Sequence, residues 1–231
     1  MSSESVWIGL DLGSTSLKAT LLDSSARIIA THCLRLRGRP APTTRDALAH
    51  LESRAADRPV AGVAVTGAGG RNIAEWLGAP YINEIIALTS GLECLAPNLR
   101  TVIELGGQDS KLLQLEREEQ SRLRLRDFSL NSLCAAGTGS FLDQQAARLG
   151  VDIESEFSDL AMASTTPASI AGRCSVFAKS DMIHQQQAAT PVEDIAAGLC
   201  LALARSFTAT VGRGMTFEQP IGFLGGVASN Q

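Results

Sequence analysis

Two cysteines stand directly before short runs of small residues. Cys134 opens the segment CAAGTGSF and Cys174 opens CSVFAKSD, and both segments are typical of the first turn of a helix. The positive end of a helix lowers the pKa of a thiol and stabilises anionic sulfur. An iron–sulfur cluster needs four thiolates, so two per chain make half a site, and a second copy related by a two-fold axis would supply the rest. The residues alone leave buried or redox-active thiols as the alternative.

The other three cysteines have apolar surroundings in the sequence. Cys33 lies in an alternating strand pattern, Cys94 in an apolar helical pattern and Cys200 within AAGLCLALA, so each is predicted to be a small core residue. The N-terminal segment lacks the basic start and apolar run of a secretory signal, and no window approaches the ~18–20 apolar residues of a membrane span. We therefore predict a cytoplasmic protein whose cysteines stay reduced unless they bind metal or do redox chemistry.

Two pairs of strand-like runs are each joined by a glycine turn, LDLGSTSLK at 10–18 and ELGGQDSK at 104–111. Backbone N–H groups in so tight a turn, together with hydroxyls, form a donor array that suits phosphate oxygens. The spacing of a P-loop is missing, and a strand follows where a P-loop would have a helix. Asp11, just before the first turn, could hold the water shell of a magnesium ion. A plain hairpin is the alternative for either turn, but two at equivalent positions favour a phosphate site.

The segment AGTGSF has a second predicted use. Gly137 and Gly139 allow a close backbone approach near a nucleotide, so one helix could touch both the nucleotide and a cluster at Cys134. ATP could then change the environment of the cluster, provided that it binds two states of the protein with different affinity. Packing of the helix through small residues is the alternative.

The composition is that of an ordinary globular protein. Of the 231 residues, 45% are apolar and 19% are charged. The formal charge of −4 gives no strongly basic surface, so neither nucleic acid nor a membrane is a predicted partner. The three histidines, at positions 32, 50 and 184, show no metal-ligand spacing.

The order strand–strand–strand–helix occurs twice, and each time it opens with an apolar strand that ends in acid–x–Gly. Strands are predicted at 6–13, 16–25, 27–38, 60–70, 101–107, 110–116, 122–131 and 220–230, and helices at 43–56, 72–78, 83–96, 134–150, 175–187 and 192–214. The predicted fold class is therefore α/β, with two similar lobes, 1–98 and 99–231, divided near Asn98. Such lobes would place both glycine turns at one cleft.

These motifs carry a resemblance. The segments GLDLGSTSLK, ELGGQDSK and GFLGGVASN resemble the first phosphate, second phosphate and adenosine motifs of the acetate and sugar kinase, Hsp70 and actin superfamily. Within it, CAAGTGSF and RCSVFAKSD resemble one branch, the BadF/BadG/BcrA/BcrD-type activator ATPases of 2-hydroxyacyl-CoA dehydratases and benzoyl-CoA reductases. The resemblance covers nearly the whole chain. It implies the duplicated actin-like (ribonuclease H-like) fold, with two lobes around a nucleotide cleft.

The resemblance also implies cofactors and roles for single residues. The cofactors are ATP or ADP, Mg²⁺ and one 4Fe–4S cluster per homodimer, with Cys134 and Cys174 as its ligands. Asp11, Glu104 and Gln108 would handle magnesium, water and the γ-phosphate. The remaining nucleotide-binding positions are Gly13, Ser14, Thr15, Lys18, Gly106, Gly107 and Asp109 at the phosphates, Gly137 and Gly139 near the cleft, and Gly225 and Gly226 against the adenosine.

Three features depart from the family pattern. Glu104 stands where the family usually has aspartate, so its carboxylate is one methylene further from the backbone. Lys179 stands where the smaller activators tend to have an acid, as in the larger, multidomain activases. The family continues beyond the adenosine motif with a closing helix and strand, so we expect this chain to be the N-terminal portion of a longer protein.

The function that the resemblance implies is ATP-dependent activation by one electron. A reduced donor such as ferredoxin or flavodoxin would load the cluster, and the electron would pass to a partner iron–sulfur dehydratase or reductase. Two other functions remain open from the sequence. A small-molecule kinase of the sugar type would need an aspartate base facing a hydroxylated substrate, and an ATP-sensing module would bind nucleotide without turnover.

Overall fold

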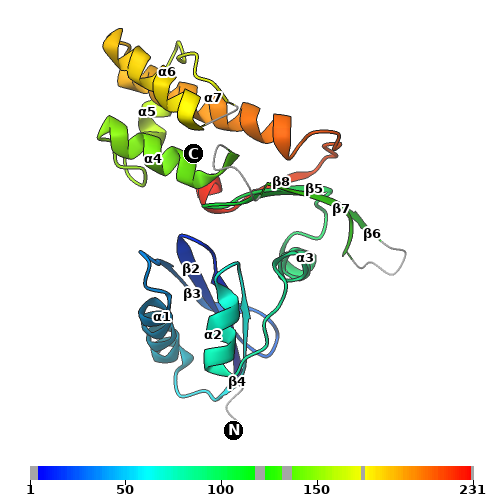
Figure 1. Cartoon of the computed structure of the whole chain (residues 1–231). Coiled ribbons are helices and arrows are strands. Elements are labelled where there is room, and N and C mark those ends of the chain that lie inside the picture. The colour runs from blue at the N-terminus through cyan, green and yellow to red at the C-terminus, as the bar shows by residue number, and fades with distance from the viewer. Residues whose placement is uncertain (1–4, 118–122, 132–136, 173–174, 230–231) are drawn as a thin grey trace. The chain divides into compact units, whose positions relative to one another are not determined.

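Two four-stranded sheets with the same strand order organise the chain (Figure 1). The computed structural model describes residues 5–117, 123–131, 137–172 and 175–229. The chain divides into two units, Met1–Leu95 and Ala96–Gln231, and each contains one sheet. The sheet orders are β3-β2-β1-β4 and β7-β6-β5-β8, and in both an antiparallel meander is completed by one parallel strand. The predicted duplication of an α/β fold is confirmed.

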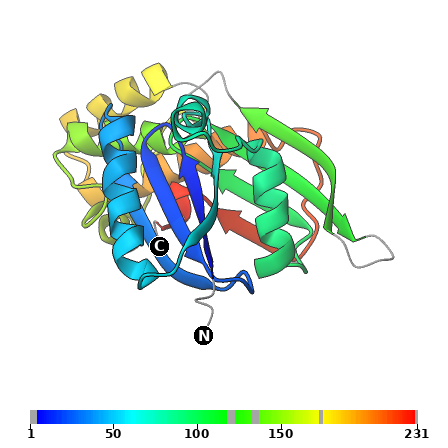
Figure 2. The same cartoon turned by 90° about the horizontal axis from the view of Figure 1, so that it is seen from below.

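The first unit buries one face of its sheet against a helix. Its elements are β1 (Val6–Leu12), β2 (Ser16–Leu22), β3 (Ile28–Arg35), α1 (Pro40–Ala55), β4 (Val60–Thr66), α2 (Gly70–Leu77) and α3 (Glu84–Leu95). Side chains alternate across a strand, and the alternate positions Ile8, Leu10 and Leu12 of β1 are buried. Ala47 and Leu51 of α1 belong to the same core. In Figure 2, α1 (light blue) runs beside the dark blue strands.

The second unit stacks helices on one face of its sheet (Figure 1). Its elements are β5 (Thr101–Leu105), β6 (Ser110–Arg117), β7 (Leu123–Asn131), α4 (Gly139–Leu149), α5 (Phe157–Ala163), α6 (Ser175–Gln187), α7 (Val192–Thr210), β8 (Ile221–Leu224) and the 3₁₀ turn η2 (Gly226–Ser229). Leu105 and Leu112 form one core with Phe141 of α4 and with Ile195 and Leu199 of α7.

Two details of the helices differ from the sequence prediction. Helix α5 was not predicted, because its seven residues are too few for a clear period, and the burial of Phe157 in the core holds it in place. Helix α7 ends at Thr210 rather than at position 214, and Gly214 has a left-handed backbone with φ of 76°. None of the helices described combines the length and hydropathy needed to cross a bilayer.

The prediction that Cys33, Cys94 and Cys200 are core residues is wrong for the first two. Cys33 is exposed because β3 is the edge strand of its sheet and this position points away from the core. Cys94 is exposed in the last turn of α3, a helix that buries only Leu92. Cys200 is partly buried and packs against the core of the second unit.

The loop between α5 and α6 is fixed to α7. Ser164 donates a hydrogen bond from Oγ to Oδ1 of Asp194 (2.6 Å), and Thr166 donates one from Oγ1 to Oδ2 (3.1 Å). These bonds, the Ser164 hydroxyl first, hold the pKa of Asp194 below its ordinary value. The carbonyl of Ala168 lies so close to Gly198 that a Cβ there would overlap it. The loop is therefore held against α7 at Ser164, Thr166 and Ala168.

Gly198→Ala is expected to lower the free energy of unfolding by about 1–3 kcal/mol, because the new methyl group must displace the backbone at Ala168. The matched control is Gly91→Ala in α3, where a Cβ would meet nothing within 4 Å. It is expected to gain about 0.5–1 kcal/mol from helix propensity alone. Urea unfolding followed by circular dichroism measures both, and an unchanged stability of Gly198→Ala would contradict the close contact.

Asp194→Asn is expected to destabilise the fold at neutral pH and progressively less in acid. Since the folded pKa of Asp194 is lowered, its contribution is complete above the pKa of the unfolded chain, about 4, and is lost as the pH falls through the folded value. Unfolding curves of parent and variant between neutral and acidic pH should therefore converge below about pH 4. Glu193→Gln, in the same turn of α7, controls for the loss of a charge near the helix start.

Candidate functional site

The β1–β2 and β5–β6 hairpins are built alike. The N–H of Gly13 donates to the carbonyl of Ser16 (3.0 Å), and the N–H of Gly106 donates to that of Asp109 (2.9 Å). In each hairpin an acid at the end of the first strand faces a lysine on the second, Asp11 opposite Lys18 and Glu104 opposite Lys111. The two glycine turns of the sequence are therefore structurally equivalent, each within its own unit.

The first hairpin holds its charges loosely. Lys18 Nζ lies 3.6 Å from Oδ2 of Asp11, and both side chains are 45% exposed. Ser14 at the tip of the turn is exposed, and Gly13 and Thr15 are half-buried. An ion pair this long and this hydrated is weak, so Lys18 can turn to an incoming anion at little cost.

Beside Asp11 lies a residue that the sequence prediction missed. Thr66 is the register partner of Asp11 in the parallel β1–β4 pair, and its Oγ1 is buried with no hydrogen-bond partner among the residues described. Gly67 follows with φ of 95°, and a Cβ there would lie 2.7 Å from Asp11 Oδ1 and would overlap the carbonyl of Leu12. The hydroxyl and the carboxylate are hard oxygen donors of the kind that Mg²⁺ or its water shell accepts, so this corner fits the predicted ion. The signal was the polar Thr-Gly that ends an otherwise apolar strand.

The second hairpin holds its lysine tightly. Lys111 Nζ lies 3.0 Å from Oε2 of Glu104 and 2.9 Å from Oδ2 of Asp109, and the lysine side chain is only 6% exposed. Burial by itself would lower the pKa of Lys111, but the two carboxylates outweigh burial and raise that pKa above its ordinary value. A Cβ at Gly106 would lie 2.7 Å from Asp109 Oδ1, so this glycine leaves room for the carboxylate.

Helix α4 is attached to the second glycine turn. The N–H of Gly139 donates to the carbonyl of Gly106, and the N–H of Ser140 donates to that of Gly107, both at 2.8 Å. A Cβ at Gly139 would lie 3.1 Å from the Gly106 oxygen and 3.2 Å from Cγ2 of Val227. The sequence predicted that Gly139 allows a close backbone approach, and in the structure the backbone that Gly139 approaches is that of the glycine turn.

Helix α4 begins later than the predicted position 134. Thr138 is the N-cap, with the extended backbone angles φ −134° and ψ 165°, so the helix begins at Gly139. Its first N–H groups point to the carbonyls of Gly106 and Gly107. At Gly137, a Cβ would lie 3.1 Å from Nδ2 of Asn131, so this glycine serves close packing.

The predicted adenosine segment repeats the corner of the first unit. Gly225 follows β8 with φ of 93°, and a Cβ there would overlap the carbonyl of Leu105, as a Cβ at Gly67 would overlap that of Leu12. Gly226 begins η2, and Val227 of this turn lies against Gly139. The second unit thereby brings together most of its predicted residues: Glu104, Gly106, Gly107, Gln108, Asp109, Gly137, Gly139, Gly225 and Gly226, with Gln108 exposed at the tip of the turn.

The predicted cluster ligands, Cys134 and Cys174, lie outside the described residues. Helix α6 begins at Ser175, the residue after Cys174, as the sequence predicted. Within the described ranges, no three or more His, Cys, Asp or Glu side chains are grouped so that they could hold a metal ion.

Comparison with known proteins gives this geometry a context. Residues 8–231 match the family described as the BadF/BadG/BcrA/BcrD ATPase family. The chain is 33% identical over 224 residues to the 2-hydroxyisocaproyl-CoA dehydratase activator of Clostridioides difficile. The matched region covers 96% of this chain and 81% of that relative.

Two solved structures have the same fold over nearly the whole chain. The activator of the 2-hydroxyisocaproyl-CoA dehydratase from Clostridium difficile, with bound ADPNP, superposes with a TM-score of 0.86 at 32% identity and covers 97% of this chain and 81% of that one. Component A of the Acidaminococcus fermentans (R)-2-hydroxyglutaryl-CoA dehydratase also gives 0.86, at 30% identity, and covers 98% of this chain and 85% of that one. The expected actin-like α/β fold is confirmed, and the chain belongs to the BadF/BadG/BcrA/BcrD ATPase family.

Proposed function

We propose that this protein is an ATP-dependent activator of an enzyme of the 2-hydroxyacyl-CoA dehydratase or benzoyl-CoA reductase type. The observation that carries the proposal is the pair of equivalent hairpins, each with an acid opposite a lysine at a glycine turn, in a chain of this ATPase family. Relatives that cover nearly the whole chain are named as activators of 2-hydroxyisocaproyl-CoA, (R)-2-hydroxyglutaryl-CoA and lactoyl-CoA dehydratases. A more distant relative, matched over half the chain, is named as a benzoyl-CoA reductase subunit.

The chain would handle the nucleotide by charge and position rather than by covalent chemistry. Lys18 is the mobile cation for the phosphates, since its pair with Asp11 is long and half exposed. Asp11 and Thr66 offer oxygen donors for magnesium or its water shell. In the second unit, Gln108 at the tip of the turn and Glu104 at its base would orient the attacking water and the γ-phosphate.

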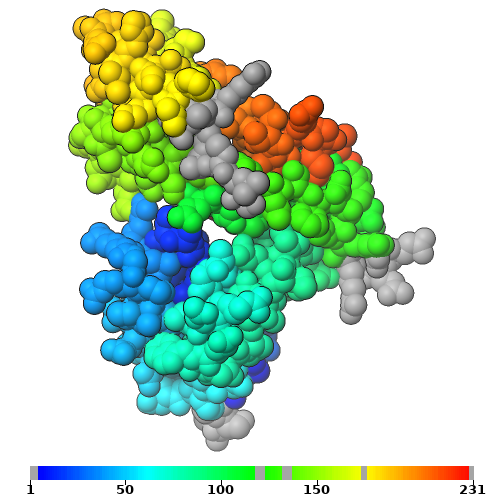
Figure 3. All heavy atoms as spheres, viewed as in Figure 1, coloured from blue at the N-terminus to red at the C-terminus, as the bar shows by residue number. Residues whose placement is uncertain are grey.

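Cys134 and Cys174, with the same residues of a second copy, would hold one 4Fe–4S cluster. Bound there, the cluster would supply single electrons, received from ferredoxin or flavodoxin and delivered to the partner iron–sulfur enzyme. Helix α6, which follows Cys174 directly, lies on the surface of its unit (yellow in Figure 3). Its Val176 and Phe177 are 66% and 65% exposed, and such apolar side chains suit an interface between two copies.

Helix α4 offers a route between the two functions. Its first N–H groups are bonded to the carbonyls of Gly106 and Gly107, so a shift of the phosphate turn would move the helix and the segment that precedes it. That segment contains Cys134. The coupling requires that ATP and ADP bind the two positions of the turn with different affinity.

Lys18→Met is expected to weaken the binding of ATP by about tenfold, because a charge-assisted contact to phosphate is lost. Lys179→Met is the matched control, since it removes an exposed lysine from α6 instead. A fluorescent ATP analogue titrated into each protein in Mg²⁺ gives the dissociation constants. Equal affinities of the two variants would remove Lys18 from the nucleotide site.

The decisive experiment for the proposed function is the iron content after strictly anaerobic purification. One cluster shared by two chains corresponds to about two iron atoms per chain. Cys134→Ser and Cys174→Ser are expected to lose the iron and the visible absorption of the cluster, whereas Cys94→Ser, which changes an exposed thiol of the first unit, is expected to keep both.

An iron-free parent, even after anaerobic reconstitution, would contradict the activator proposal. In that case ATP turnover with a hydroxylated substrate would indicate a kinase of the same fold. Tight ATP binding without turnover would indicate a nucleotide sensor.

A further inference from the structure

One of the positions at which the two hairpins differ changes the surroundings of the lysine. Asp109 of the second turn occupies the place that Ser16 has in the first, since each carbonyl accepts the bond from the equivalent glycine N–H. Lys18 therefore has one carboxylate at 3.6 Å, whereas Lys111 has two at 3.0 and 2.9 Å. Lys111 therefore has one more carboxylate beside it than Lys18 has.

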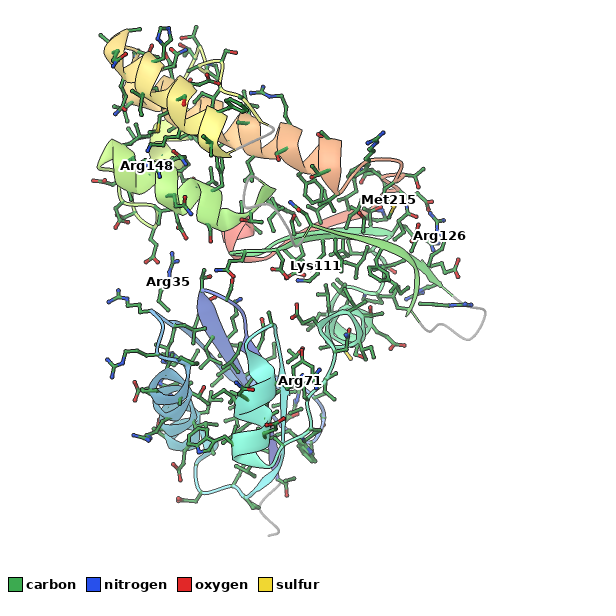
Figure 4. The ribbon with its side chains drawn as sticks, viewed as in Figure 1. Arg35, Arg71, Lys111, Arg126, Arg148 and Met215 are labelled. Carbon is green, nitrogen blue, oxygen red and sulfur yellow. The ribbon has the colours of Figure 1, made fainter. Side chains whose placement is uncertain are left out.

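Lys111 lies on a defined face of the second sheet. Leu112, the next residue of β6, packs in the core with α4 and α7, so Lys111 projects from the opposite face (Figure 4). Glu104 is its cross-strand partner and projects from the same face. The carboxyl side chains of Glu104 and Asp109 are 23% and 35% exposed, so ions from solvent can reach the pair even though Lys111 is buried.

Two carboxylates that reach one common point offer oxygen ligands to a hard divalent cation. In this hairpin the point within about 3 Å of both is already taken by the ammonium group of Lys111. A second cation placed beside that ammonium would be repelled strongly, because the surroundings are partly shielded from water. The lysine thus competes with metal for the same two oxygens.

We propose that Lys111 is a built-in counter-ion that keeps divalent cations out of the Glu104–Asp109 pair in the nucleotide-free protein. Lys111 holds Glu104 in position and sets the ion specificity of the site, and it does not itself bind phosphate. The importance of this role of Lys111 rests on the proposed function, whereas the exclusion of cations rests only on the geometry of the hairpin.

The test is the binding of Mn²⁺ to the nucleotide-free full chain, measured by the electron paramagnetic resonance signal of the free ion. Lys111→Met is expected to bind Mn²⁺ at least about tenfold more tightly than the parent, because the resident charge is removed and both carboxylates remain. Lys111→Arg keeps the charge and should bind as the parent does. Adding Asp109→Asn to Lys111→Met should abolish the gain.

Lys179→Met is the matched control for overall charge. It removes an exposed lysine of α6, so the affinity for Mn²⁺ should stay that of the parent. An equal gain in Lys179→Met and Lys111→Met would overturn the proposal, because the effect would then be one of overall charge.

A folded Lys111→Met with the parent's affinity for Mn²⁺ would also overturn it. If that variant is unfolded in metal-free buffer, Lys111→Gln replaces it, since the amide can still donate hydrogen bonds to the carboxylates. Mn²⁺ should then raise the thermal unfolding temperature of Lys111→Gln but not that of the parent, and a rise of equal size in both would refute the role of Lys111. No nucleotide, iron or partner enters this test, so its failure and a failure of the activator proposal are separate results.

Discussion

The ends of β1 and β5 are each fixed by a backbone contact that leaves no room for a side chain. Gly67 lies against the carbonyl of Leu12, and Gly225 lies against that of Leu105, both with a left-handed backbone. These carbonyls belong to the residues directly after Asp11 and Glu104, so the two contacts fix the positions of both acids and the points at which the turns begin. The glycine turns, the opposite lysines and the attachment of α4 all follow from this position of the strand ends.

Within this common frame the two hairpins have acquired different electrostatics. The first leaves a hydrated lysine with one distant partner, and the second encloses its lysine between two carboxylates. A mobile cation suits the capture of a phosphate, whereas an enclosed cation suits the fixing of an acid. The same backbone therefore supports two different tasks in the two units, and the exchanges of Asp11 for Glu104 and of Ser16 for Asp109 both contribute to the difference.

Most of the fold could be predicted from the sequence because its strands alternate regularly and its turns carry glycine. Ile8, Leu10 and Leu12 show the period of two directly, and the cross-strand pairs of both hairpins follow from the short turns. The start of α4 could not be predicted, because the residues from Cys134 onward suit a helix and only the extended Thr138 and the bonds to Gly106 and Gly107 fix its first turn.

Only part of the candidate site could be predicted from the sequence. Motifs identified the turns, but the burial of Lys111 and of the Thr66 hydroxyl depends on strands that lie next to each other only in the folded sheet. Likewise, the exposure of Cys33 follows from the place of β3 at the edge of the sheet, which its own apolar neighbours do not show. Tertiary neighbours, not local pattern, decide these features.

The pairing of β5 with β8 has a consequence for the order of events during synthesis. In the first unit, β4 follows its partner β1 after two short strands and one helix, so that sheet can close early. In the second unit, β5 waits for β8 while two strands and all the helices α4–α7 are made. Until then the backbone groups along one edge of β5 are unpaired, and such an edge can pair with the wrong strand. The long interval makes closure of the second sheet the slow, non-local step of folding, and the nascent second unit is the part that a chaperone would have to protect.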